Sequence, residues 1–163
     1  MKDEMKTALE TAMDEFDQKN SAAAKRQEAT ETKETEFSRT VERLFTEVVR
    51  PAMEKVKATL GQRHHDCEII EEKQTVTTDM HQHAATISLT IKPAPPARGG
   101  YAMMASRTIC FAAARHEGKI AVGTTSSLPV RRVEGARGSY EPSQLSPEEV
   151  EKQLVVFVKE VFA

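Results

Sequence analysis

The chain has 163 residues, of which 39% are hydrophobic and 29% are charged, and its net charge is −2. This length suits one domain with an appendage, and no apolar run approaches the ~20 residues that a membrane-spanning helix needs. The two cysteines are too few for a disulfide scaffold, and the first residues lack the apolar core of a signal peptide, so we expect a cytoplasmic protein.

The first sixty residues have one long helical pattern whose apolar stripe is interrupted in the middle. Large apolar side chains recur at helical spacing over residues 3–18 and again over 36–60, but residues 20–36 carry no apolar side chain larger than alanine. Asn20 and Ser21 favour local backbone bonding, so we expect the helix to stop and restart there. Residues 22–36 could then form either a solvated helix or a loose tether. We also expect a kink at Pro51, which lacks a backbone donor, and an end at Gly61.

An antiparallel meander is predicted in the middle of the chain. Residues 86–92 alternate apolar and polar side chains without error, as in a strand with one buried face. Weaker patterns predict strands over residues 67–76, 103–113 and 119–123, with a tight turn at 115–118. Residues 124–145 are rich in Gly, Pro and Ser, and within them residues 128–133 could add a fifth, edge strand.

The chain ends in a clear helix signal. Ser146, Pro147 and Glu149 form a capping box with proline at the first helical position, and an apolar stripe follows. The predicted fold is therefore α+β: long, kinked or hairpin-like N-terminal helices, a four- to five-stranded antiparallel meander, and a C-terminal helix packed on the sheet. We divide the chain into an acidic helical arm or tether, residues 1–36, and a single α+β domain, residues 37–163.

Two clusters contain residue types that bind metals. His64, His65 and Cys67 form the first cluster, and His81 and His83 form the second. Zinc favours tetrahedral sets of such ligands, but none of the known ligand spacings is present. These residues would also suit the polar ends of strands, so we assign no metal and no other cofactor.

The strongest electrostatic feature is a basic region. Residues 92–138 hold eight Lys or Arg against two Glu, whereas residues 1–36 hold six basic against ten acidic side chains. The planar guanidinium group meets carboxylates and phosphates in two places, so an anion could bind there. The candidate anion-binding residues are Arg98, Arg131, Arg132 and Arg137. The alternative is that they balance the acidic helices.

These observations favour a non-enzymatic assembly or adaptor protein, because the N-terminal stripes need a cover and no catalytic signature is present. Its partner would be a second copy of the chain (a homo-oligomer, in a coiled coil for example) or a helix of another protein. The alternative is a small domain that binds an anionic ligand through residues 92–138. Nucleic acid is disfavoured by the pI of about 6.2 and by the scarcity of aromatic residues.

Overall fold

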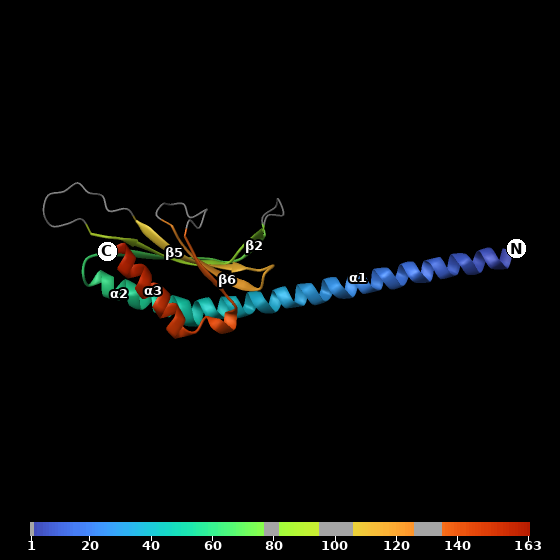
Figure 1. Ribbon diagram of the computed structural model, residues 1–163, viewed down its shortest axis with the longest axis horizontal. Helices are drawn as coiled ribbons and strands as arrows, with labels where there is room; N and C mark the ends of the chain where they lie inside the picture. Colours follow the sequence, from blue (N-terminus) through green and yellow to red (C-terminus); the bar gives the residue numbers. More distant parts are fainter. Residues whose placement is uncertain (1, 77–81, 95–105, 126–134) are drawn as a thin grey trace. The chain divides into compact units, whose positions relative to one another are not determined.

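The computed structural model describes residues 2–76, 82–94, 106–125 and 135–163. They form two compact units, Met1–Glu36 and Phe37–Ala163. The predicted α+β class and the antiparallel sheet are confirmed (Figure 1). None of the described helices combines the length and the apolar character that crossing a bilayer requires.

The first helix is longer than the sequence predicts. Helix α1 spans Lys2–Leu44 without interruption, so the expected stop at Asn20 and Ser21 is wrong. The helical penalty of Asn or Ser is only a fraction of a kcal/mol, about 0.7 at most, and the three alanines that follow are the best helix formers. Residues 22–36 are accordingly helical rather than a loose tether.

A π-helical turn, Phe45–Val49, joins α1 to helix α2, Arg50–Gly61. The backbone N–H of Arg50 bonds the carbonyl oxygen of Phe45, five residues earlier, and Pro51 follows with no donor of its own. The irregularity expected at Pro51 thus takes the form of a wider turn just before it. The turn keeps four buried side chains on one line although each lies four residues from the next: Val41, Phe45, Val49 and Met53.

The main sheet has five antiparallel strands in the order β1-β4-β5-β6-β7. Their bounds are β1 Asp66–Glu72, β4 Thr86–Lys92, β5 Arg107–Ala114, β6 Lys119–Thr125 and β7 Gly135–Tyr140. The strand predicted over residues 86–92 is confirmed as β4, and the predicted turn between β5 and β6 places Gly118 at φ 64°.

Of two further strand predictions, one falls outside the described residues and one needs correction. The fifth strand is β7, a glycine-containing segment with a register shift, whereas the edge strand predicted over residues 128–133 lies outside the described residues. The strand predicted over 67–76 is divided, because β2, Thr75–Val76, pairs with β3, Gln82–His83, in a separate two-stranded sheet.

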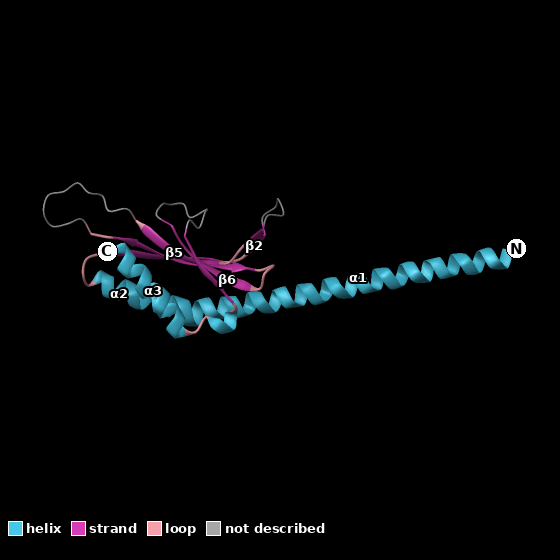
Figure 2. Ribbon diagram, in the orientation of Figure 1, coloured by secondary structure: helices cyan, strands magenta, loops and turns pink. Residues whose placement is uncertain are grey.

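Helix α3, Pro147–Val161, closes the fold after a 3-10 turn at Pro142–Gln144. The Ser146 hydroxyl accepts a hydrogen bond from the Glu149 backbone N–H at 3.2 Å, as the capping motif predicts. Figure 2 shows α2 and α3 together on one side of the sheet, giving two layers. The core between the layers includes fully buried side chains from both: Phe45, Met53, Ile87, Leu89, Phe111, Leu154 and Phe157.

On the opposite face of the sheet, the paired parts of the central strands β4 and β5 carry small side chains. Thr90 on β4 and Thr108 on β5 are directly paired and only 1% and 2% exposed, and their hydroxyl oxygens lie 2.8 Å apart. Each hydroxyl therefore supplies the partner that a buried polar group needs.

Candidate functional site

The N-terminal unit carries a continuous row of exposed apolar side chains, here called the N-terminal stripe. Its members are four large side chains of α1, between 57% and 66% exposed: Met5, Leu9, Met13 and Phe16. They are spaced by four, four and three residues and so occupy one face of the helix. Residues 3–18 also hold six carboxylates and one lysine, so the helix around the stripe is acidic.

One of the four predicted anion-binding arginines lies among the described residues, and it is bound to a carboxylate. Arg137, on β7, pairs through its Nη2 with the Glu160 carboxylate of α3, and its side chain is only 15% exposed. Arg107 donates to the backbone oxygen of the same glutamate at 3.1 Å. In the described residues these arginines hold the end of α3, whereas Arg98, Arg131 and Arg132 lie outside them.

The two groups of metal-binding residue types are separated by the length of a strand. Asp66 pairs with Lys92 and Glu72 with Thr86, so His64, His65 and Cys67 lie at one end of β1 and His83 lies beyond the other, about 20 Å away. His81 is outside the described residues. Among those that are described, no three His, Cys, Asp or Glu side chains are placed to share an ion.

His65 has an evident structural role. Its Nδ1 accepts a hydrogen bond from the Ala94 backbone N–H at 3.0 Å, and its ring centroid lies 4.7 Å from that of Phe162. The imidazole thus connects the start of β1 to the residues after β4 and to the end of α3. Because Nδ1 is occupied by this bond, it is not available to a metal.

Both cysteines are buried and free. Burial, with Asp66 nearby, raises the pKa of the Cys67 thiol, and burial with Glu72 raises that of Cys110 to about 11. Since the thiolate is the reactive form, neither side chain is poised to act as a nucleophile at neutral pH.

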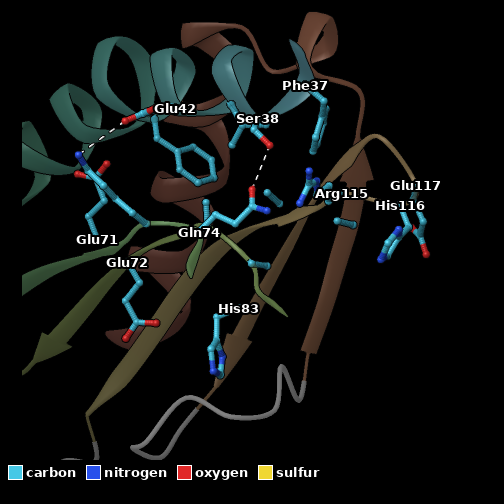
Figure 3. A pocket seen from close by; sticks show the side chains of 17 residues that line it. Phe37, Ser38, Glu42, Glu71, Glu72, Gln74, His83, Arg115, His116 and Glu117 are labelled. Atoms are coloured by element: carbon cyan, nitrogen blue, oxygen red, sulfur yellow. Dashed lines mark hydrogen bonds and ion pairs between the residues drawn. The ribbon is translucent and has the colours of Figure 1, made fainter. Parts of the chain in front are cut away.

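A pocket of about 420 Å³ lies in the second unit, between the start of its helical layer and the ends of β1 and β5. Figure 3 shows Phe37, Ser38 and Glu42 on one wall, and Arg115, His116 and Glu117 in the β5–β6 turn. The apolar lining includes four alanines: Ala84, Ala85, Ala113 and Ala114. This volume lies within the usual range of ligand pockets, roughly 300–1,000 Å³.

Several polar groups that line the pocket are bound to one another or to a neighbour. The Ser38 hydroxyl donates to Gln74 Oε1 at 3.0 Å, and Lys73 lies 3.7 Å from the Glu42 carboxylate. Glu71 accepts two hydrogen bonds from Arg50, at 2.6 and 3.1 Å. The Ser38 hydroxyl is thus bonded to an amide group of the pocket wall.

The second hollow is an open groove of about 490 Å³ between α2 and α3, here called the α2–α3 groove. Its apolar lining comes from both helices and consists of Ala52, Val56, Leu60, Leu154, Val155 and Val158. Lys55, Lys159, Glu151 and Thr59 complete its lining. Lys55 and Glu151 form an exposed ion pair at 3.4 Å, of the kind that contributes little to stability.

Comparison with known proteins gives no relative, since no family model, curated protein or solved structure matches this chain. Its function has to be argued from the stripe, the pocket and the groove alone.

Sequence reasoning did not find either the pocket or the groove. The pocket joins Phe37 with Arg115, far apart in the chain, and no periodic pattern reports such a meeting. The groove had a visible signal in Val155, which with Val156 widens the apolar stripe of α3 and which lines the groove. So wide a stripe predicts that most of the circumference of the helix is buried, but the two valines are 48% and 41% exposed.

Proposed function

We propose that this protein is a non-enzymatic assembly or adaptor protein of the cytoplasm that associates with a second copy, or with a partner helix, through its N-terminal stripe. The observation that carries this proposal is the exposure of Met5, Leu9, Met13 and Phe16 on one face of α1. The described helix has no break at which residues 3–18 could fold back on residues 22–36. A contiguous apolar row of this kind typically marks an interaction surface.

The cytoplasmic assignment is supported by two buried thiols that are not paired with each other.

The test compares two double variants of the full chain with equal added charge. Leu9→Glu with Phe16→Glu places two carboxylates on the stripe, seven residues apart. Thr11→Glu with Gln18→Glu places two on the opposite face of the same helix, also seven residues apart. A carboxylate forced into an apolar contact stays desolvated and unpaired, so the stripe variant should weaken self-association about tenfold or more.

Sedimentation velocity over a range of concentrations measures this, and the opposite-face variant should sediment like the original chain. If the original chain is a monomer at tens of micromolar and captures no helix, the proposal is wrong.

A second candidate function is the binding of a small anionic ligand. Its site would be the pocket of Figure 3 rather than the predicted loop site. Arg115 lines a pocket of ligand size that is partly apolar, and Arg137 does not line it. The ligand would be a carboxylate or phosphate with a compact apolar body.

Thermal-shift measurements with phosphates and short-chain carboxylic acids test this candidate. A stabilising compound should lose its effect in Arg115→Ala and keep it in Lys119→Ala, which removes the same charge from an exposed strand position outside the pocket. Equal loss in both variants would show a non-specific charge effect.

A further inference from the structure

Under the proposed function the N-terminal stripe is buried by a partner, and the surface of the partner that contacts it is still to be identified. The α2–α3 groove offers the complementary shape. It is an apolar channel between two helices, and a third helix can pack in such a channel with its apolar face down, as amphipathic helices do in helix-binding grooves.

The lengths of the two surfaces agree. The stripe runs from Met5 to Phe16, about 16 Å along a helix at 1.5 Å per residue. The groove is lined from Ala52 to Leu60 on α2 and from Glu151 to Lys159 on α3, each about 12 Å long. The stripe can therefore lie along the whole groove with only its ends outside.

The charges of the two surfaces are also complementary. Six carboxylates and one lysine lie in residues 3–18, and Lys55 and Lys159 line the groove with the single carboxylate of Glu151. The Lys55–Glu151 pair is exposed, 75% at the lysine side chain, so the lysine can turn to an incoming carboxylate without breaking a buried contact. Long lysine stems can also cover apolar surface beside the groove while their charged ends stay in water.

We propose that the N-terminal stripe of one copy docks in the α2–α3 groove of a second copy. This inference rests on the proposed function and specifies its acceptor surface. The groove residue Val155 is 48% exposed and would be covered by the docked helix, whereas its neighbour Val156, 41% exposed, does not line the groove.

These two valines provide a matched pair of variants of the full chain. Val155→Glu places a carboxylate in the docking surface, and Val156→Glu places the same group one residue away, outside the lining. Because both positions are exposed, neither change disturbs the core. We expect Val155→Glu to weaken self-association about tenfold or more and Val156→Glu to change it less than about twofold. Equal effects of the two variants would overturn the proposal.

Photocrosslinking identifies the acceptor directly. A ¹⁴N chain with benzoylphenylalanine in place of Phe16 is mixed with unmodified ¹⁵N chain, irradiated and digested. The expected products join a ¹⁴N peptide of residues 3–18 to a ¹⁵N peptide of α2 or α3.

Products that join two N-terminal peptides would show that stripes pair with each other, so this inference fails while the proposed function stands. Products within ¹⁴N chains alone would place the stripe in its own groove and overturn the inference. A chain that neither crosslinks nor self-associates would contradict both the inference and self-association.

Discussion

Two stretches of the N-terminal helical region have a similar apolar periodicity, but the apolar side chains of one are exposed and those of the other are buried. Between Met5 and Phe16 the large apolar side chains are more than half exposed, whereas between Val41 and Met53 those at a similar spacing are at most 1% exposed. The later stretch packs on the sheet and on α3 within the unit Phe37–Ala163. Periodicity therefore identifies an apolar helix face that has to be buried, but it does not identify the surface that packs against this face.

The two stretches also owe their helical structure to different causes. The later one is held by tertiary burial, roughly 1.5–3 kcal/mol for each large side chain. The earlier one relies on helix-forming composition and its own backbone bonds, because none of its large side chains is buried. Local bonds and propensity alone support marginal helices, which is why an external partner would stabilise this region most.

The largest expected effect comes from truncating one phenylalanine in each region. Phe45→Ala opens a cavity in the core and should lower the free energy of unfolding by about 3–5 kcal/mol, whereas Phe16→Ala should leave it nearly unchanged in dilute solution. Urea denaturation at low micromolar concentration measures both. A similar loss in Phe16→Ala would show that residue 16 is part of the folded core.

The pH dependence of the free energy of unfolding probes the second unit, because both cysteines lie there. The pKa of Cys110 is raised from 9.0 to about 11, so below pH 9 its thiol is protonated in both folded and unfolded chains. Between pH 9 and 11 the unfolded chain releases this proton first, and the free energy of unfolding should fall by up to about 2–3 kcal/mol. Denaturation midpoints at pH 8 and pH 11 test this. Cys110→Ala should remove that part of the decrease, and an unchanged pH profile in this variant would contradict the assignment.

Removal of single threonine hydroxyl groups compares a buried position in the sheet with an exposed position in α1. Thr90→Val leaves the buried Thr108 hydroxyl without its 2.8 Å partner and should lower the free energy of unfolding by about 1–3 kcal/mol. Thr11→Val removes an exposed hydroxyl and should change it by less than about 0.5 kcal/mol. Denaturation of the double variant Thr90→Val with Thr108→Val completes the cycle. Its loss should be smaller than the sum of the two single losses, and strict additivity would show that the two hydroxyls do not interact.

Local patterns predicted most of this fold. The alternation of residues 86–92 and the capping signal at Ser146 each correspond to an observed element. The errors arose where local preference is weak, since Asn20 and Ser21 disfavour a helix too little to end one between strong helix formers. Strand β7 was missed because Gly135, Gly138 and Ser139 have little strand propensity, and its pairing with β6 supplies what propensity does not.

The candidate sites were less predictable than the fold. The anion-binding prediction was drawn from charge in sequence, but charge alone cannot show that Arg137 pairs with Glu160 across the fold. The pocket depends on segments as distant as Phe37 and Arg115, and the α2–α3 groove depends on how two helices pack. By contrast, the N-terminal stripe was visible in the sequence, because it is a local property of one helix.

Removal of the arm should also change stability little, and it is the most direct test of the division between the regions. Every buried core side chain lies at or after Val41 among the described residues, so a chain beginning at Thr35 retains the whole described core. Its denaturation should remain cooperative, with a free energy of unfolding within about 1 kcal/mol of the full chain in dilute solution, because residues 3–18 bury none of their large side chains. Sedimentation at matched concentrations should show weaker self-association, and the full chain's association should weaken as salt screens its acidic arm. Loss of the cooperative transition in the shorter chain would show instead that the arm is part of the domain, and that residue 36 is not its boundary.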